Sequence, residues 1–462
     1  MSNRYIPLTE KEKRDMLDSL GADSIDDLYS DIPPKLKLNE LLDIPPSKSE
    51  REIKEEIKKI LLKNDDLEEF TSFLGGGVWN HYIPDHVKNL TSRSEFLTSY
   101  TPYQAEASQG LLQAMFEYQS MITELVDLPV VNSSMYGWPS ALGEAALMSS
   151  RITRGSEFLV PEYISPKRFS VLETYCSGPE INIRKIKQGK TAGKINISDL
   201  EEKINDNTSG FYLEIPSYLG FIETQTKKIS RILKEKDVPF VVGVNPISLG
   251  ILEPPGEYGA DIVVGEGQPL GNPINFGGPL LGIFACKDDR EYIHQLPGRI
   301  SGMTQTEKNE ERGFVMTLQT REQHIRREKA TSNICTNNML CALASLIYLS
   351  SLGAEGLQRI AEKCVENAEY AMKRLNDLRG VNTPLFDAPH FNEFTIKFDQ
   401  DYLNGRELRS KLLSKKIMGG VPLCDYFKNL KNASLWCTTE KHSKEDIENL
   451  VCAIKEIREE KA

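Results

Sequence analysis

The sequence lacks the features that mark secreted, membrane-spanning and nucleic-acid-binding proteins. Its eight cysteines occur singly, with no Cys-x-x-Cys pair, which excludes a disulfide framework and indicates a reducing compartment. Basic residues are in deficit, because 56 Lys and Arg face 67 Asp and Glu and leave a net charge of −11, the wrong sign for phosphate backbones. No apolar segment opens the chain, and its most apolar helical stretch, residues 339–352, is shorter than the ~20 residues of a membrane span. We therefore expect a cytoplasmic protein that binds neither membranes nor nucleic acid.

Motifs of several enzyme classes are missing as well. The six histidines form no His-Glu-x-x-His motif and the cysteines have no paired spacing, so we expect no metal site. Residues 265–271, GEGQPLG, fall short of a dinucleotide-binding loop because Leu270 takes the place of its third glycine. A Gly-x-Ser-x-Gly nucleophile elbow is also absent.

The middle of the chain has the pattern of an α/β fold. Short apolar runs alternate with helical stretches, and we expect strands within residues 180–186, 210–216, 239–244, 260–265 and 279–285. Runs that are apolar throughout and separated by helices are typical of a parallel sheet covered on both faces. Ligands of such sheets bind at the carboxyl ends of the strands.

Composition and pattern divide the chain into three parts. Residues 1–72 are predicted to be an N-terminal helical arm, residues 73–331 a large α/β domain and residues 332–462 a small C-terminal α+β domain. In the arm, Thr9 and Glu12 have the spacing of a capping box. The charged helix expected at residues 49–63 has an Ile/Leu stripe that it cannot bury alone, so it packs on its own body or on a partner subunit.

Two stretches have more than one interpretation. Three successive glycines at residues 75–77 form either a flexible turn between arm and body or a loop that closes over a pocket, with His81 and Tyr82 at its tip. Residues 101–128 are predicted to be one long helix that begins at Thr101, the N-cap of a capping box. Capping does not account for the neighbouring Tyr100, Tyr103 and Glu106.

Two further segments could bind an anion. Residues 320–329, TREQHIRREK, are the one concentrated basic stretch, and a helix there would place Arg321 and His324 on one face. This is either a solvated helix with internal ion pairs or an arginine that grips a carboxylate or phosphate. Gly277-Gly278-Pro279 is either a tight turn or a backbone approach to a phosphate.

Four stretches carry a resemblance to a known family. They read YTPYQAEASQG, PPGEYGADIVVG, LPGRISGMT and LQTREQHIRREKATSNICT. They resemble the glycine dehydrogenase (decarboxylating) of the glycine cleavage system, its P-protein, and the similarity runs from about Phe73 to the C-terminus. The resemblance implies the fold of the fold type I pyridoxal-phosphate enzymes. By length, the chain is similar to the first of the family's two homologous halves, subunit 1 or alpha.

The resemblance also locates the cofactor's attachment point. In the family's other subunit, the Schiff-base lysine belongs to a His-Lys pair after the strand that reads ADIVVG here. Gln268 and Pro269 occupy those places, and Asn245 stands where an acidic partner for the pyridinium nitrogen is expected. The resemblance therefore implies no catalytic residue in this chain, no covalent cofactor on it and no activity of the chain alone.

The implied assembly is an α2β2 heterotetramer with glycine dehydrogenase subunit 2 (beta), which binds the pyridoxal phosphate. This oxidoreductase decarboxylates glycine and passes the aminomethyl group to the lipoyl arm of the H-protein. Because fold type I sites lie at subunit interfaces, we expect this chain to complete the partner's pocket. The candidate residues are Tyr100, Tyr103, Glu106, Gly277, Gly278, Pro279, Arg321 and His324. Two alternatives are a stand-alone pyridoxal-phosphate transaminase or decarboxylase that uses another lysine, such as Lys287, and a non-catalytic scaffold.

Overall fold

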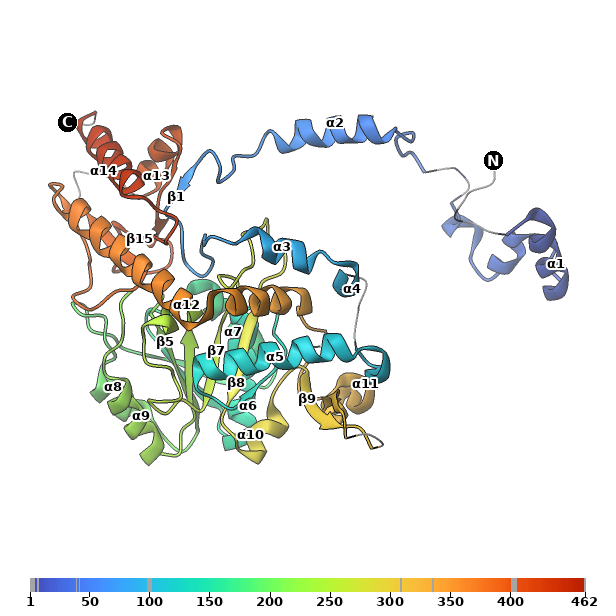
Figure 1. Ribbon diagram of the computed structural model, residues 1–462, viewed down its shortest axis with the longest axis horizontal. Coiled ribbons are helices and arrows are strands. Elements are labelled where there is room, and N and C mark those ends of the chain that lie inside the picture. Colours follow the sequence, from blue (N-terminus) through green and yellow to red (C-terminus); the bar gives the residue numbers. More distant parts are fainter. Residues whose placement is uncertain are drawn as a thin grey trace. The chain divides into compact units, whose positions relative to one another are not determined.

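The computed structural model (Figure 1) describes residues 5, 8–38, 40, 42–97, 102–307, 310–334, 336–399 and 405–460. The chain divides into two units, Met1–Asp65 and Asp66–Ala462. Each unit is described by itself.

The first unit contains short helices: α1 (Glu10–Leu20), η1 (Ile25–Tyr29), η2 (Pro34–Leu36) and α2 (Glu50–Leu61). Its first helix begins at the expected capping box, in which the Glu12 N–H donates to Thr9 Oγ1 at 3.3 Å and the Thr9 N–H donates to Glu12 Oε2 at 2.7 Å. A second capping box, formed by Ser49 and Glu52, begins α2. The apolar stripe of α2 is exposed, with Ile57 at 48%.

The second unit is built on a seven-stranded sheet. Its strands are β2 (Val130–Val131), β3 (Glu157–Pro161), β4 (Asn182–Ile186), β5 (Thr208–Ile215), β6 (Phe240–Val244), β7 (Ile262–Glu266) and β8 (Gly282–Cys286), in the order β2-β8-β7-β6-β5-β3-β4. The five strands from β4 to β7 in this order are parallel, whereas β8 runs antiparallel to β7 and β2 antiparallel to β8. The expectation of a mostly parallel sheet is confirmed.

Helices cover both faces of this sheet. They are α5 (Gln109–Val126), α6 (Trp138–Thr153), α7 (Pro166–Ser177), α8 (Ile197–Lys203), α9 (Thr226–Glu235), α10 (Arg290–Gln295) and η4 (Pro246–Gly250). Neighbouring strand residues enter different cores, since Val242 packs with α5 and α9 and Val241 packs with α6 and α7. This alternation is the period of two that a strand imposes on its side chains.

Helix α12 (Met339–Asn376) joins the large sheet to the C-terminal part (Figure 1). It bends at Gly353, whose φ of 61° and ψ of −176° are not helical, so the apolar helical stretch at residues 339–352 ends at this bend. Among the described residues, α12 alone is long and apolar enough to cross a membrane by length and composition. Leu343 and Leu346 of its first half, however, are buried in the core that also contains α5.

The C-terminal part has a second, antiparallel sheet, ordered β11-β12-β15-β14. Its elements are β11 (Val381–Asn382), β12 (Glu393–Phe398), α13 (Gly405–Ser414), β14 (Val421–Pro422), β15 (Ala433–Cys437) and α14 (Lys444–Glu459). A short strand before the glycines, β1 (Thr71–Ser72), pairs in parallel with β13 (Ile417–Met418). The bounds of the three parts proposed from the sequence, 1–72, 73–331 and 332–462, stay predictions.

Two of the local expectations are wrong. The helix expected from Thr101 begins at Gln109, after a turn of η3 (Ala105–Ala107), and Thr101 itself lies outside the described residues. Gln109 explains the difference, since its side chain donates to the Phe314 carbonyl and accepts from the Phe314 N–H, both at 2.8 Å. This tertiary contact with the hairpin of β9 (Ile300–Gln305) and β10 (Arg312–Thr317) fixes where the helix begins.

The basic stretch at residues 320–329 does not form one helix. It consists of the short turns η5 (Gln319–Arg321), α11 (Gln323–Arg326) and η6 (Arg327–Lys329). A φ of 53° at Arg327 interrupts the helical path. Two short helices, α3 (Asp85–Thr91) and α4 (Ser94–Leu97), complete the described elements.

Candidate functional site

A buried ion pair lies at the carboxyl ends of the parallel strands. Arg168, in the first turn of α7, binds the carboxylate of Glu214 near the end of β5 with two hydrogen bonds, Nε–Oε1 at 2.8 Å and Nη2–Oε2 at 3.0 Å. The side chains are 6% and 1% exposed, so the pair is out of water. The guanidinium carbon lies 3.9 Å from the ring centre of Trp138, the first residue of α6. These side chains fill the edge of the sheet at which ligands of α/β folds bind.

The loop after β7 is held in the interior by Gln268. Its side-chain oxygen accepts from the Trp79 N–H at 3.0 Å, and its amide donates to the carbonyls of Trp79 and Asn272 at 3.2 and 2.8 Å. Pro269, which follows, is buried. Gln268, where the resemblance leads us to expect a histidine, thus hydrogen-bonds to backbone groups. Pro269, where it leads us to expect a lysine, has no amine.

Two further carboxyl groups are buried beside this edge. Glu266, the last residue of β7, accepts hydrogen bonds from the backbone N–H groups of Trp138, Gln268 and Leu281 at 3.0 to 3.2 Å. Glu393, the first residue of β12, accepts from the Gly76 N–H at 2.6 Å. Burial raises the pKa of each carboxyl to about 7, against the opposing effect of these hydrogen bonds.

Asn245 follows β6, where the resemblance led us to expect an acid. It is 3% exposed, and its side-chain oxygen accepts from the Ile247 N–H at 3.1 Å, which caps η4. A neutral amide that caps a helix supplies no negative charge to a protonated pyridine nitrogen. The residues of this edge therefore do not fit covalently bound pyridoxal phosphate: Pro269 offers no amine, Asn245 offers no negative charge, and the Arg168 guanidinium is paired with Glu214.

Lys287, the alternative Schiff-base lysine, lies at the opposite edge of the sheet. It follows β8, whose last residue, Cys286, pairs with Ile262 at the amino end of β7. Its ammonium group forms an ion pair with Asp261 at 2.7 Å. This places Lys287 away from the carboxyl ends at which Glu266 and Gln268 lie.

A second polar cluster gathers some of the residues chosen from the sequence. The hydroxyl of Tyr103 accepts from Arg299 Nη2 at 2.7 Å, and the edge of its ring meets His324 with the ring centres 5.8 Å apart. Glu322 joins them, with its carboxylate 3.7 Å from Arg299 Nη2 and 3.6 Å from His324 Nδ1. We call these four residues the Tyr103 cluster. Tyr103 is 49% exposed and Arg299 4%, so the cluster presents a tyrosine at the surface above a buried guanidinium.

Arg321 holds the backbone segment that carries Arg299 of the Tyr103 cluster. Its guanidinium donates to the carbonyls of Leu296 and Gly298, the segment that carries Arg299. Burial lowers the pKa of Arg321 to about 10. The Arg321 side chain thus binds backbone carbonyls. The single helix of the first interpretation is wrong, and an arginine of this stretch that grips a carboxylate or phosphate stays a prediction.

The remaining candidate residues are not part of the Tyr103 cluster, and one of them lies outside the described residues. Glu106 is exposed in η3. Gly277, Gly278 and Pro279 are exposed in the loop between β7 and β8, beside Phe276, which is 92% exposed. Tyr100 lies outside the described residues.

Sequence reasoning did not single out Arg168, Glu214, Arg299 or Glu322. The first two are far apart in the chain and sit in an unremarkable helix and an apolar strand, so no local pattern marks them. Arg299 and Glu322 could have been chosen from the sequence, because they belong to two stretches that carry the resemblance. Arg299 lies in LPGRISGMT and Glu322 in LQTREQHIRREKATSNICT.

Comparison with known proteins decides the family. The model of the glycine cleavage system P-protein matches residues 3–454. The chain belongs to this family. A probable glycine dehydrogenase (decarboxylating) subunit 1 of Pyrococcus horikoshii is 48% identical over 459 residues, which cover 99% of this chain and 100% of that protein. The corresponding protein of Thermococcus onnurineus is 47% identical, with coverage of 99% and 100%.

Solved structures confirm the fold as well as the family. A glycine decarboxylase (P-protein) of the glycine cleavage system, crystallised in inhibitor-bound form, superposes with a TM-score of 0.88 at 37% identity and covers 98% of this chain and 100% of its own. The glutamate decarboxylase of Lactobacillus brevis has a TM-score of 0.70 at 14% identity, with coverage of 92% and 96%, and shows the fold alone. The P-protein resemblance and the fold type I architecture expected from the sequence are both confirmed.

Proposed function

We propose that this chain is the subunit 1 of a glycine dehydrogenase (decarboxylating) and that it has no Schiff-base chemistry of its own. The observation that carries the proposal is the carboxyl edge of the sheet. Pro269 stands at the lysine position, and the Arg168–Glu214 pair occupies the interior with Trp138 stacked on it. A chain with these residues at the carboxyl edge of its sheet keeps the fold of the family but does not bind the cofactor covalently.

The active partner in this proposal is subunit 2 (beta), with which the chain forms an α2β2 heterotetramer in the cytoplasm. Subunit 2 binds the pyridoxal phosphate, which supplies the electron sink for decarboxylation of glycine when bound. A lipoylated H-protein then accepts the aminomethyl group. The complex is an oxidoreductase, and the chain by itself is inactive.

Within this assembly, we assign the Tyr103 cluster to the border of the partner's pocket. Its half-exposed tyrosine lies over a buried guanidinium that donates to the tyrosine hydroxyl, an arrangement suited to hold a carboxylate or phosphate at the surface. The exposed loop of Phe276, Gly277, Gly278 and Pro279 is a second candidate for the same border. Burial of Phe276 against the partner would remove a large apolar side chain from water.

The first experiment tests whether the chain binds the cofactor covalently. The purified chain is mixed with pyridoxal phosphate, its visible spectrum is recorded, and the mixture is reduced with borohydride and mapped by mass. We expect no aldimine band and no reduced adduct on a specific lysine. An adduct on one lysine, Lys287 included, would show that the chain is a pyridoxal-phosphate enzyme in its own right.

The second experiment separates a shared pocket from a mere scaffold. Tyr103→Phe removes the hydroxyl that accepts from Arg299, and Tyr426→Phe is its matched control because Tyr426 is also 49% exposed. In the complex with subunit 2, we expect Tyr103→Phe to lower glycine turnover while the complex stays assembled, and Tyr426→Phe to leave turnover unchanged. Equal turnover of both variants would refute the shared pocket and favour the scaffold.

A further inference from the structure

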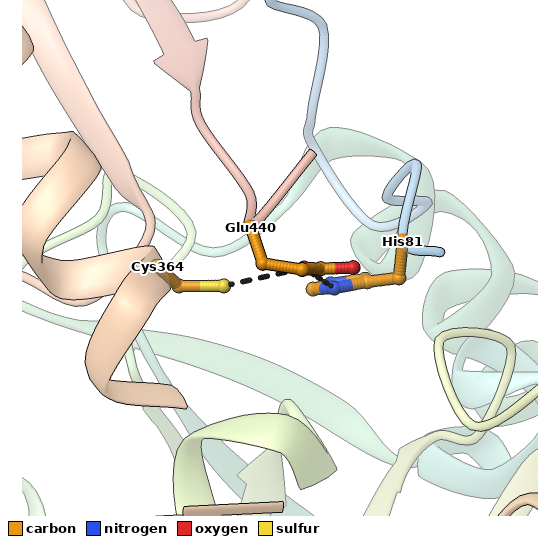
Figure 2. Close-up of side chains that lie close together, drawn as sticks. All are labelled: His81, Cys364 and Glu440. Carbon is orange, nitrogen blue, oxygen red and sulfur yellow. Dashed lines mark hydrogen bonds and ion pairs between the residues drawn. The ribbon is translucent and has the colours of Figure 1, made fainter. Parts of the chain in front are cut away.

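Three side chains from distant parts of the sequence, His81, Cys364 and Glu440, lie close together (Figure 2). His81 follows the three glycines, Cys364 lies in the second half of α12, and Glu440 follows β15. Glu440 Oε2 lies 2.7 Å from His81 Nδ1 and 3.7 Å from Cys364 Sγ. One nitrogen, one sulfur and one oxygen atom of the three residues all lie within 4.8 Å of one another.

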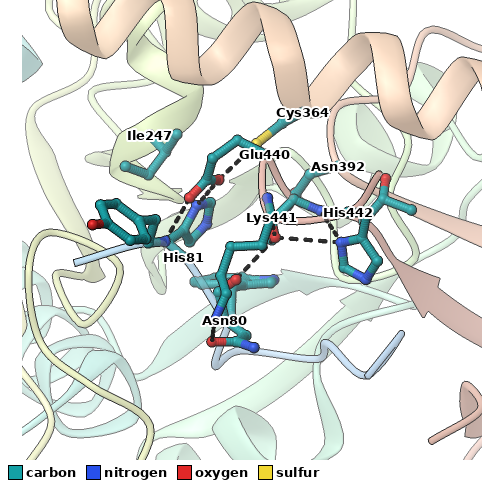
Figure 3. Close-up of polar contacts among 12 residues, drawn as sticks. Asn80, His81, Ile247, Cys364, Asn392, Glu440, Lys441 and His442 are labelled. Carbon is teal, nitrogen blue, oxygen red and sulfur yellow. Dashed lines mark hydrogen bonds and ion pairs between the residues drawn. The ribbon is translucent and has the colours of Figure 1, made fainter. Parts of the chain in front are cut away.

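The three residues are buried and fixed in place by their surroundings (Figure 3). The side chain of His81 is 1% exposed and that of Glu440 13%, while Cys364 is fully buried. The second carboxylate oxygen of Glu440 accepts from the Tyr82 N–H at 2.6 Å. Thr439 donates to the Asn80 carbonyl at 2.9 Å, so the residues next to both His81 and Glu440 are tied together. His81 is buried rather than at the tip of an exposed loop, whereas Tyr82 is 62% exposed. The two interpretations of the glycine-rich segment otherwise stay predictions.

One buried polar group of the cluster, Nε2 of His81, has no hydrogen-bond partner among the described residues. Buried polar atoms are nearly always paired. Nε2 lies on the other side of the imidazole ring from Nδ1, the atom that faces Glu440, so it is not the atom that meets the other two side chains.

We propose that His81, Cys364 and Glu440 form a binding site for a divalent metal ion of the zinc class. Thiolate, imidazole and carboxylate are the three ligand types that zinc takes from proteins, and three protein ligands leave a fourth position for water or a further side chain. Magnesium and calcium do not suit the site because they prefer oxygen ligands alone. No sequence motif marks this site, because His81 and Glu440 are 359 positions apart and Cys364 and Glu440 are 76 positions apart.

Two of the three distances between ligand atoms can be compared with a tetrahedral site. In a tetrahedral zinc site, a sulfur and an oxygen ligand are about 3.6 Å apart, and a nitrogen and an oxygen ligand about 3.3 Å. The distance of 3.7 Å between Cys364 Sγ and Glu440 Oε2 already matches the first value. The distance of 2.7 Å between His81 Nδ1 and Glu440 Oε2 has to open by about 0.6 Å. The ion would replace their hydrogen bond with two coordinate bonds.

The charges of the bound state balance. The thiol of Cys364 loses its proton to solvent when the ion binds, and the thiolate and the Glu440 carboxylate together neutralise the two positive charges. Neutral His81 completes the set without adding charge. A neutral cluster is the form that a buried site tolerates best.

Cobalt(II) is the probe that tests this proposal, because its bond to a thiolate has a charge-transfer absorption band. The full chain is stripped with a chelator and titrated with cobalt, and zinc is then titrated in competition with a chromophoric chelator. We expect the band to saturate at one cobalt per chain and to be absent in Cys364→Ser. Cys176→Ser is the matched control, because Cys176 is an equally buried cysteine in α7, and it should retain the band.

Two further variants keep the test informative if Cys364→Ser does not fold. Glu440→Gln and His81→Gln preserve the size of each side chain and should each weaken zinc binding at least about 100-fold. Absence of a stoichiometric cobalt–thiolate absorption band in the wild-type chain would overturn the proposal. Water would then be the partner of His81 Nε2. A band of equal strength in Cys364→Ser, or unchanged zinc affinity in both glutamine variants, would overturn it too.

Discussion

Removal of Arg168 tests the statement that a buried ion pair fills the carboxyl edge of the sheet. In Arg168→Met, the apolar stem remains and can still lie on Trp138, but the carboxylate of Glu214 is left with the Tyr212 hydroxyl, which donates to it at 3.1 Å. Breaking a buried pair from one side costs about 3–5 kcal/mol, because the surviving charge stays out of water without its partner. We expect the free energy of unfolding to fall by that amount.

Urea unfolding followed by tryptophan fluorescence is a suitable assay, because Trp138 stacks on the guanidinium. Arg359→Met is the matched control, since Arg359 and Glu355 form an i,i+4 pair with side chains 74% and 79% exposed. That variant should lose less than about 1 kcal/mol. Adding Glu214→Gln to Arg168→Met should recover stability, because no uncompensated charge is then buried.

Two results would refute this reasoning. A loss in Arg168→Met no larger than in Arg359→Met would mean that water reaches Glu214 and that the edge is open. A double variant as unstable as Arg168→Met would mean that Arg168 acts through packing on Trp138 rather than through its charge.

The other predictions concern the packing and titration of the same unit. The folded-state pKa of Glu393 is about 7 against an ordinary value of 4.5, so the folded chain holds this proton more tightly, and the associated stability is lost as the pH rises through 7. Between about pH 6 and about pH 8 the wild type should lose about 1 kcal/mol more than Glu393→Gln, and equal losses would contradict the assignment. A Cβ at Gly75 would lie 2.2 Å from Glu393 Oε1 and 2.8 Å from Cys437 Cβ, so Gly75→Ala should cost about 1–3 kcal/mol in thermal or urea unfolding. Gly178→Ala, with open space around it, should change stability by less than about 0.5 kcal/mol, and similar effects of the two variants would argue against the close approach. Gln109→Ala leaves the Phe314 backbone groups unpaired and should cost about 1–3 kcal/mol. Gln113→Ala is the control and should cost much less, because the half-buried Gln113 side chain donates only to the exposed Glu117 carboxylate. Equal unfolding midpoints of the two variants would show that β10 does not need the Gln109 contact.

The stretch LPGRISGMT contains Arg299 of the Tyr103 cluster, and hydrogen bonds hold its backbone on both sides of that residue. Gln119 donates to the Ser301 carbonyl and accepts from the Ser301 N–H at 3.0 and 2.9 Å, so α5 holds the strand that follows Arg299. Arg321 grips the preceding carbonyls. The backbone on both sides of Arg299 is therefore held in place, which limits where its guanidinium can lie.

Much of the fold was determined by the sequence alone. The apolar runs at β5, β6 and β7 are buried throughout, and such runs separated by helices fit only a parallel sheet covered on both faces. Capping boxes at Thr9 and Ser49 began their helices as their spacing predicts, because the hydrogen bonds involved join residues three positions apart. The replacement of lysine by Pro269 also needed no structure, since a side chain without an amine cannot form an imine wherever it lies.

Tertiary structure alone decided what surrounds those positions. Gln109 sets the start of α5 through a partner 205 residues away, and Arg168 meets Glu214 across the sheet edge, so no pattern within one segment carries either contact. The same holds for His81, Cys364 and Glu440, which lie on a loop, a helix and the end of a strand. Local propensity acts over a few residues, whereas a site is made of side chains that the fold brings together from distant segments. The sequence therefore predicts which chemistry this edge lacks, and only the packing shows which side chains meet there.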